Sequence, residues 1–186
     1  SPVMVRDVKE RFRGNEVTVV SPDVGGVVRA RALAKRLESD LAIIDKRRPK
    51  ANVAEVMNII GDVEGRTCVI MDDMVDTGGT MGEAIIALKK LGARDVYCCA
   101  SHALLSGPAV DRLAASPVTE VAVTNTIAIP PERRFDRLKV LSIAGLLATP
   151  ASAQDPKKTK GKVTAMTATS MTSPPSSEST RNQGQR

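Results

Sequence analysis

Six short runs of continuous apolar residues, most of them branched, set the strongest constraint on how this chain folds. A strand with one solvent-facing side alternates apolar and polar residues, whereas a continuous apolar run indicates a strand buried on both faces, as in parallel sheets. The runs occupy residues 17–21, 41–45, 67–71, 96–100, 121–124 and 138–143. We therefore expect a mainly parallel sheet covered by helices.

Helical patterns separate these runs. Residues 27–37 alternate an Ala/Leu face with a basic face, residues 81–92 end on Gly92 as a C-cap, and residues 107–116 follow a Gly-Pro start. Strands that alternate with helices predict an α/β fold with a doubly wound sheet flanked by helices. In such sheets ligands bind at the carboxyl ends of the strands.

The composition argues against two classes of function. The chain has no Trp, one Tyr and two Phe, which disfavours recognition of nucleic acid by base stacking. No window approaches about 18 uninterrupted apolar residues, so we expect no membrane span.

The cysteines and the single histidine give no sign of a metal cluster. Cys68, Cys98 and Cys99 lie inside apolar runs without a CxxC spacing, which predicts reduced core thiols of a cytoplasmic protein. His102 stands alone near a strand end. We expect it to make a structural hydrogen bond.

The composition changes abruptly after Leu147. Residues 149–186 are rich in Ser, Thr, Pro and Lys with almost no apolar periodicity, which predicts a disordered tail after a folded domain of residues 1–148. Six basic and two acidic residues give this tail a charge of +4, out of +6 for the whole chain. The basic character is therefore mostly a property of the tail, and we expect no nucleic-acid partner.

The stretch VIMDDMVDTGGT, residues 69–80, combines acids and a glycine turn between a strand and a helix that begins near Met81. The glycines let successive backbone N–H groups point inward and bind a phosphate at the helix N-terminus. Ionised carboxylates only accept hydrogen bonds, so the paired acids match vicinal sugar hydroxyls or a hydrated Mg²⁺. The alternative is an Asp N-cap with neighbouring surface acids. The candidate ligands of a phosphorylated ribose are Asp72, Asp73, Asp76, Thr77, Gly78, Gly79 and Thr80.

A second strand–turn–helix segment, VVSPDVGGVVRAR at residues 19–31, offers a further phosphate site. The backbone N–H groups of Gly25 and Gly26 can donate to a diphosphate, and Asp23 can hold a metal ion beside it. The alternative is a plain tight turn.

A cationic segment, DKRRPKAN at residues 45–52, follows the second strand directly. We expect Lys46 and Arg48 to lie in a loop that closes over phosphates and neutralises charge during transfer. A solvated basic surface loop is the alternative.

Several segments together resemble the carboxyl-terminal half of the ribose-phosphate pyrophosphokinase family, over residues 3–148. The stretch DDMVDTGGT resembles the phosphoribosyl-binding loop shared with type I phosphoribosyltransferases, whereas DKRRP and EVMNI are typical of the synthetases alone. The segments are VVSPDVGGVVRARALAKRL, LAIIDKRRPKAN, EVMNIIGDVEGR, VIMDDMVDTGGT and LLSGPA.

The resemblance implies a phosphoribosyltransferase-like fold and a Mg²⁺-dependent transfer of the diphosphoryl group of ATP to C1 of ribose 5-phosphate. It implies that Asp72 and Asp73 hold the ribose hydroxyls and that residues 76–80 bind the 5-phosphate. Lys46 and Arg48 match the basic residues of the family's catalytic loop, and Asp23 matches an aspartate associated with Mg²⁺.

The chain departs from the family pattern in two respects. Gly78 stands where the family usually has Ala or Cys, which we expect to cost loop entropy without blocking phosphate binding. The family's amino-terminal half, with the ATP-binding loops, has no counterpart here. We therefore expect a fragment that binds ribose 5-phosphate, lacks most of an ATP site, and forms a homo-oligomer or assembles with an amino-terminal half or a full-length synthetase. A non-catalytic regulatory subunit and a phosphoribosyltransferase are the alternatives.

Overall fold

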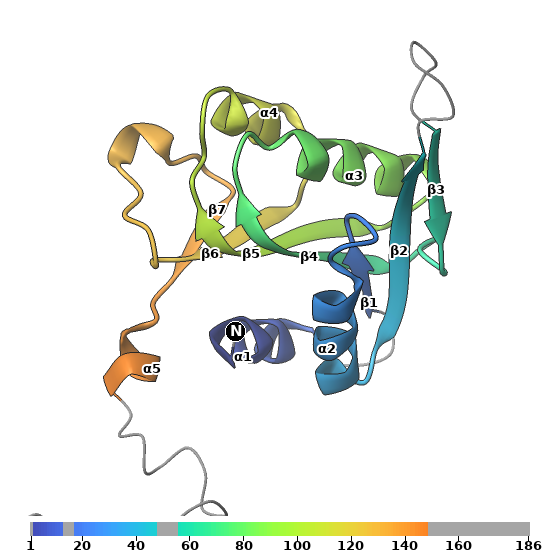
Figure 1. Ribbon diagram of the computed structural model, residues 1–186, viewed down its shortest axis with the longest axis horizontal. Coiled ribbons are helices and arrows are strands. Elements are labelled where there is room, and N and C mark those ends of the chain that lie inside the picture. Colours follow the sequence, from blue (N-terminus) through green and yellow to red (C-terminus); the bar gives the residue numbers. More distant parts are fainter. Residues whose placement is uncertain (1, 13–16, 48–55, 149–186) are drawn as a thin grey trace, which may run out of the picture. The chain divides into compact units, whose positions relative to one another are not determined.

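The computed structural model describes residues 2–12, 17–47 and 56–148. Within them, seven strands form one sheet in the order β3-β2-β1-β4-β5-β6-β7 (Figure 1). The strands are β1 Val17–Ser21, β2 Asp40–Arg47, β3 Val56–Ile60, β4 Thr67–Val75, β5 Asp95–Ala103, β6 Glu120–Thr124 and β7 Leu138–Leu141.

Neighbouring strands run parallel except for β2 and β3, which pair antiparallel. Strand β1 lies between β2 and β4, with Ser21 opposite Ile43 and Val20 opposite Ile70. Strands β2 and β3 lie on one side of β1, and strands β4 to β7 follow in order on the other side. The expected doubly wound, mainly parallel α/β sheet is confirmed.

Helices cover both faces of this sheet. Helices α1 (Pro2–Arg11) and α2 (Val27–Leu37) lie on one face, and α3 (Gly79–Lys90) and α4 (Ala109–Ala115) lie on the other (Figure 1). A 3₁₀ turn at Pro131–Arg133 and the short helix α5 (Ala144–Ala148) complete the described elements.

The strand side chains divide between two apolar clusters. Val19 belongs to the cluster that includes residues of α1 and α2, whereas its neighbour Val20 belongs to the cluster that includes residues of α3 and α4, and both are fully buried. Burial on both faces explains the continuous apolar runs in the sequence. The three cysteines are buried as expected, and burial raises the pKa of Cys68 and of Cys99 to about 12. These thiols are therefore unreactive core residues.

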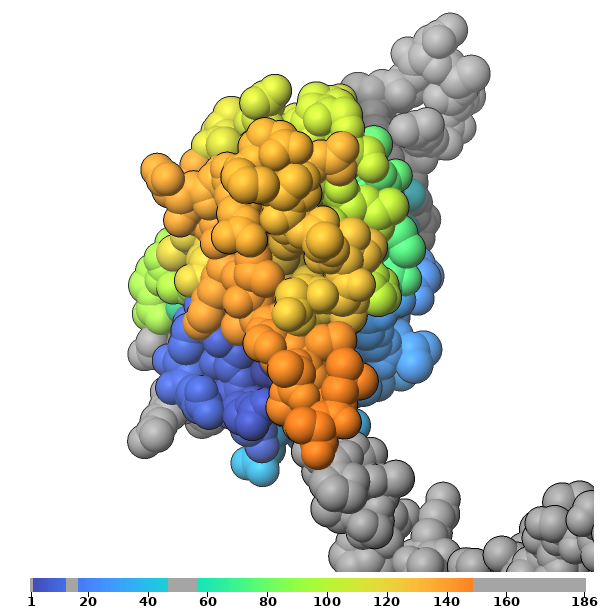
Figure 2. All heavy atoms as spheres, turned by 90° about the vertical axis from the view of Figure 1, so that its left-hand side faces the viewer, coloured from blue at the N-terminus to red at the C-terminus, as the bar shows by residue number. Residues whose placement is uncertain are grey.

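Ion pairs join α1 to the last strands of the sheet. Asp7 accepts from Lys139 on β7, and Arg11 bridges Asp7 and Glu120. Figure 2 shows the late residues of the described chain, in orange, beside the blue helix α1.

Several elements of the fold differ from the sequence-based expectation. Helix α1 and the edge strand β3 were not predicted, and β2 continues to Arg47 because β3 supplies it with backbone partners. Helix α3 begins at Gly79, two residues before the expected start. The predicted tail, residues 149–186, lies outside the described residues. Among the described helices, none has the length and apolar character that crossing a bilayer requires.

Candidate functional site

A cavity of about 300 Å³ opens beside the carboxyl ends of β1 and β4. These adjacent strands mark the point where the strand order reverses, which is the expected ligand position in a doubly wound sheet. The lining residues are Asp23, Asp72, Asp73, Met74, Val75, Asp76, Thr77, Gly78, Gly79, Thr80 and Met81. The structure thus brings together the ribose-phosphate candidates and the metal candidate Asp23.

The acid pair lies within β4, which continues to Val75, beyond the predicted run of residues 67–71. Pairing with β5 continues past the acids, because Met74 and Val75 lie opposite His102 and Ala103. The strand therefore fixes the backbone on both sides of the acids.

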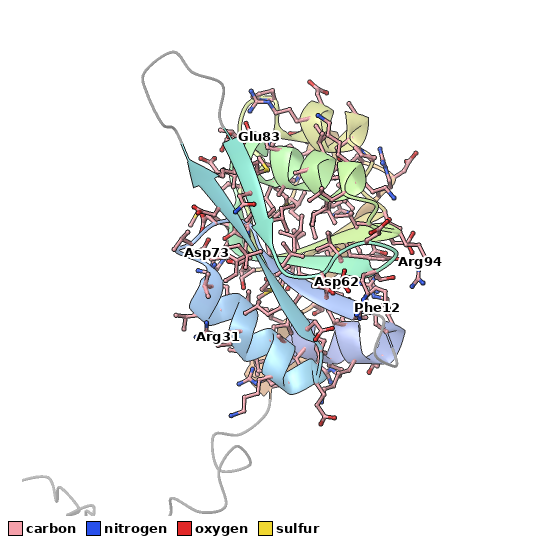
Figure 3. The ribbon with its side chains drawn as sticks, turned by 90° about the vertical axis from the view of Figure 1, so that its right-hand side faces the viewer. Phe12, Arg31, Asp62, Asp73, Glu83 and Arg94 are labelled. Atoms are coloured by element: carbon pink, nitrogen blue, oxygen red, sulfur yellow. The ribbon has the colours of Figure 1, made fainter. Side chains whose placement is uncertain are left out.

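Both carboxylates bind one guanidinium. Arg29 of α2 donates to Asp72 Oδ1 at 3.1 Å and to Asp73 Oδ2 at 3.0 Å. The backbone N–H of Asp73 also donates to Asp72 Oδ1, at 2.8 Å. Figure 3 shows Asp73 beside the first turn of α2. The acids are thus oriented before any ligand binds.

The two carboxylates differ in acidity. Burial raises the pKa of Asp72 to about 6, and the neighbouring charge of Asp73 adds to this effect. Desolvation also raises the pKa of Asp73, but its hydrogen bond with Asp72 and the charge of Arg29 together lower it below the usual value. Asp72, whose pKa is raised, is also the more buried of the two, with a side chain that is 20% exposed against 50% for Asp73.

The glycine turn brings the N-terminus of α3 to the same cavity. Gly78 has φ +71°, and a Cβ there would lie 3.3 Å from Ala109 Cα, so glycine avoids both strain and a tight contact. The first bond of α3 runs from Gly82 N–H to Gly78 O, which leaves the preceding N–H groups without intrahelical partners. Within the described part of the chain, no side-chain hydrogen bond caps this terminus. Its geometry is suited to a phosphate.

Neighbouring elements hold the glycine turn in place. Arg112 of α4 donates to Thr77 O at 3.1 Å, and the N–H of Ser106 donates to Asp76 O at 2.9 Å. The side chains of Asp76, Thr77 and Thr80 are exposed at the cavity. The backbone is therefore constrained while the polar side chains remain accessible.

The β1–α2 turn contributes Asp23 to the cavity. Asp23 Oδ1 accepts from Gly26 N–H at 2.7 Å, and Ser21 Oγ donates to Asp23 O. The predicted donation of the Gly26 N–H to a diphosphate would require Asp23 to move, whereas Gly25 is exposed. The diphosphate role of this turn stays a prediction.

The carboxylates present are suited to Mg²⁺ only with help from a substrate. Among the described residues, no group of three or more His, Cys, Asp and Glu side chains could hold a metal ion. Mg²⁺ usually binds one or two carboxylates together with substrate phosphates and water. Asp23, Asp72 and Asp73 line one cavity and supply such oxygen ligands.

The predicted basic loop is only partly described. Lys46 lies on β2, paired opposite Met57 of β3, and so belongs to a strand where a loop was expected. Its Nζ donates to Glu83 of α3 at 2.7 Å, and Figure 3 shows Glu83 beside the β2–β3 hairpin. Lys46 does not line the cavity described above. Arg48 lies outside the described residues.

His102 makes the expected structural hydrogen bond, with Nδ1 2.9 Å from Thr126 Oγ1. Sequence reasoning missed three residues at or near the site, namely Arg29, Glu83 and Arg112. Each contacts a residue at least 35 positions away in the sequence. No local pattern in the sequence points to these contacts.

Comparisons with known proteins agree with this geometry. The family model described as "Phosphoribosyl transferase domain" matches residues 4–133. A ribose-phosphate pyrophosphokinase of Neisseria meningitidis serogroup A is 58% identical over 149 residues, which are 80% of this chain and 45% of that protein. One from Burkholderia pseudomallei is 60% identical over 149 residues, 80% of this chain and 46% of that protein.

A solved structure supports the same relationship. Phosphoribosylpyrophosphate synthetase from Mycobacterium smegmatis matches with a TM-score of 0.72 and 42% sequence identity, over 78% of this chain and 47% of that one. The chain therefore spans about half the length of these relatives.

Proposed function

The chain belongs to the phosphoribosyl transferase domain family, and we propose that it is the ribose 5-phosphate-binding part of a ribose-phosphate pyrophosphokinase. The complete enzyme would transfer the diphosphoryl group of ATP to C1 of ribose 5-phosphate, yielding 5-phosphoribosyl 1-diphosphate. The proposal is supported by relatives of that name at 58% and 60% identity.

One observation carries the assignment to a sugar phosphate. A single cavity is lined both by two aligned carboxylates and by the N-terminus of α3. The carboxylates accept hydrogen bonds from hydroxyl groups, and the helix N-terminus donates to an anion. A phosphorylated ribose presents both kinds of group within one small molecule.

Each residue then has a defined part in binding. Asp72 and Asp73 accept from the ribose hydroxyls and orient the sugar. The backbone of Gly78 and Gly79 and the hydroxyls of Thr77 and Thr80 donate to the 5-phosphate, and Asp76 lies at the entrance of the same turn. Binding both ends holds C1 in a fixed position, and such positioning is the main contribution that a protein makes to phosphoryl transfer.

The donor side of the reaction needs positive charge. Lys46 and Arg48 would neutralise charge on the transferred diphosphoryl group, and Asp23 would hold Mg²⁺ with the help of the substrates. When bound, Mg²⁺ supplies charge neutralisation on the phosphates. Lys46 must leave Glu83 to act, because the two form an ion pair in the described structure.

Binding of ribose 5-phosphate provides the first test. Calorimetric titration of the chain should detect binding of ribose 5-phosphate. The double variant Thr77→Val/Thr80→Val should bind this ligand more weakly. Failure of the unmodified chain to bind ribose 5-phosphate would contradict the proposal directly.

Turnover provides the second test. ATP, Mg²⁺ and ribose 5-phosphate are mixed with the chain alone and with the chain plus the amino-terminal half of a relative. We expect the diphosphorylated sugar only in the complemented reaction, because this chain spans about half of its relatives. Absence of product there would favour a non-catalytic associated subunit, whereas release of pyrophosphate with a purine or pyrimidine base would favour a phosphoribosyltransferase.

A further inference from the structure

We propose that Arg29 is a positioning residue that sets Asp72 and Asp73 to recognise two sugar hydroxyls, and so selects ribose over 2-deoxyribose. The inference rests on the proposed function and deepens it, because it concerns the specificity of the same cavity.

The contacts of Arg29 are divided evenly between the two acids. One guanidinium nitrogen donates to Asp72 Oδ1 at 3.1 Å and another donates to Asp73 Oδ2 at 3.0 Å. A carboxylate has two oxygens and about four acceptor positions, so each acid keeps capacity for a hydroxyl after binding Arg29. Two separate acceptors therefore face a ligand that carries two neighbouring donors.

The shape of the guanidinium matters more than its charge. Its planar fork sets the separation and orientation of the two carboxylates, whereas the ammonium of a lysine is a point charge that cannot fix both. Without this bridge, two adjacent carboxylates repel each other and adopt other rotamers. The pair would then present no fixed arrangement to a diol.

Arg29 also connects the two loops of the site. It lies in the first turn of α2, directly after the Asp23–Gly26 turn, while both acids lie on β4. The side chain is 36% exposed, so it is not part of the apolar core that stabilises the fold. Its replacement should therefore change the site without unfolding the protein.

Recognition of two hydroxyls implies discrimination against a sugar that lacks one. 2-Deoxyribose 5-phosphate carries the same phosphate but would leave one carboxylate without its partner. A hydrogen bond to a charged group is worth enough to change affinity by about tenfold or more. The phosphate end of the cavity is unaffected by this difference.

The test compares three ligands by calorimetry: ribose 5-phosphate, 2-deoxyribose 5-phosphate and inorganic phosphate. The proteins are the unmodified chain, Arg29→Gln, Arg29→Lys and the control Arg31→Gln. Arg31 is exposed on the same helix, and Figure 3 shows it farther along α2 from Asp73. Circular dichroism and urea unfolding establish whether each variant is folded. If Arg29→Gln does not fold, the comparison is made with Arg29→Lys.

We expect the unmodified chain and Arg31→Gln to bind ribose 5-phosphate at least about tenfold more tightly than the deoxy sugar. In Arg29→Gln and Arg29→Lys the ratio should fall below about threefold, with the affinity for inorganic phosphate unchanged within about twofold. If either folded Arg29 variant keeps the full ratio, the positioning role is wrong. If the unmodified chain does not bind ribose 5-phosphate, the proposed function fails and this inference fails with it.

Discussion

Replacing Asp72 by Asn should stabilise the protein at neutral pH while weakening ribose 5-phosphate binding. Burial raises the pKa of Asp72 from 3.8 to about 6. This shift means that ionising the Asp72 carboxyl group costs about 3 kcal/mol more in the folded protein than in the unfolded chain. Asn has nearly the same shape, still accepts from the N–H of Asp73, and carries no charge to desolvate. We therefore expect a gain of about 2–3 kcal/mol at pH 7.5.

The pH dependence distinguishes this cause from improved packing. Because the folded pKa is raised, the folded protein holds the Asp72 proton more tightly than the unfolded chain does. The stabilisation is fully present below pH 3.8 and is lost as the pH rises through about 6. The advantage of Asp72→Asn should therefore grow by roughly 1–2 kcal/mol between pH 5 and pH 7.5.

Urea unfolding at several pH values measures this difference. The hydrogen bond with Asp72 contributes to the lowered pKa of Asp73, so the measured pH dependence belongs to the pair of acids and is compared as such between the two proteins. Asp76→Asn serves as a matched control, because Asp76 lines the same cavity but is exposed, and its effect should stay within about 0.5 kcal/mol. A destabilised Asp72→Asn protein at pH 7.5, or a gain independent of pH, would refute the reasoning.

Three further predictions concern other parts of the molecule. Lys46→Met should lower kcat by at least about a hundredfold in the complemented assay and leave the Kd for ribose 5-phosphate unchanged, because Lys46 does not line the sugar cavity. Gly82→Ala should stabilise α3 by about 0.8–1 kcal/mol in urea unfolding, since a Cβ there meets nothing within 4 Å. Its counterpart Gly92→Ala should destabilise by about 1–2 kcal/mol, because Gly92 has φ +84° and a Cβ would lie 3.2 Å from Glu64 Cγ. Asp7→Asn should cost about 1–3 kcal/mol of unfolding free energy, since Asp7 is 11% exposed and binds both Arg11 and Lys139; an unchanged urea midpoint would contradict that role.

The sequence allowed much of the fold to be predicted, because its signals are local. Continuous apolar runs predicted six of the seven described strands, and the pattern of residues 27–37 matched α2 at both ends. The edge strand β3 was missed because it is exposed on alternate residues and its central residue is Asn58, which strands disfavour. The predicted end of β2 was too early because its last residues pair with β3, which was itself not predicted.

The residues of the cavity were predictable for a related reason. The acids and the glycine turn lie within nine consecutive residues, and the strand-to-helix connection that carries them is itself a local signal. Local patterns did not predict the hydrogen bonding or the acidity of each group in the cavity. The bond from Gly26 N–H to Asp23 and the different pKa values of two neighbouring acids depend on three-dimensional surroundings.

The position of Arg29 shows where sequence reasoning reaches its limit. Arg29 and Asp72 are 43 residues apart, and they meet because β1 pairs directly with β4 while β2 and β3 lie on the other side of β1. That order brings the first turn of α2 to the end of β4. A different strand order would keep both motifs intact and would leave the acids without their shared cation. The arrangement of the two acids thus depends on sheet topology as well as on the motif.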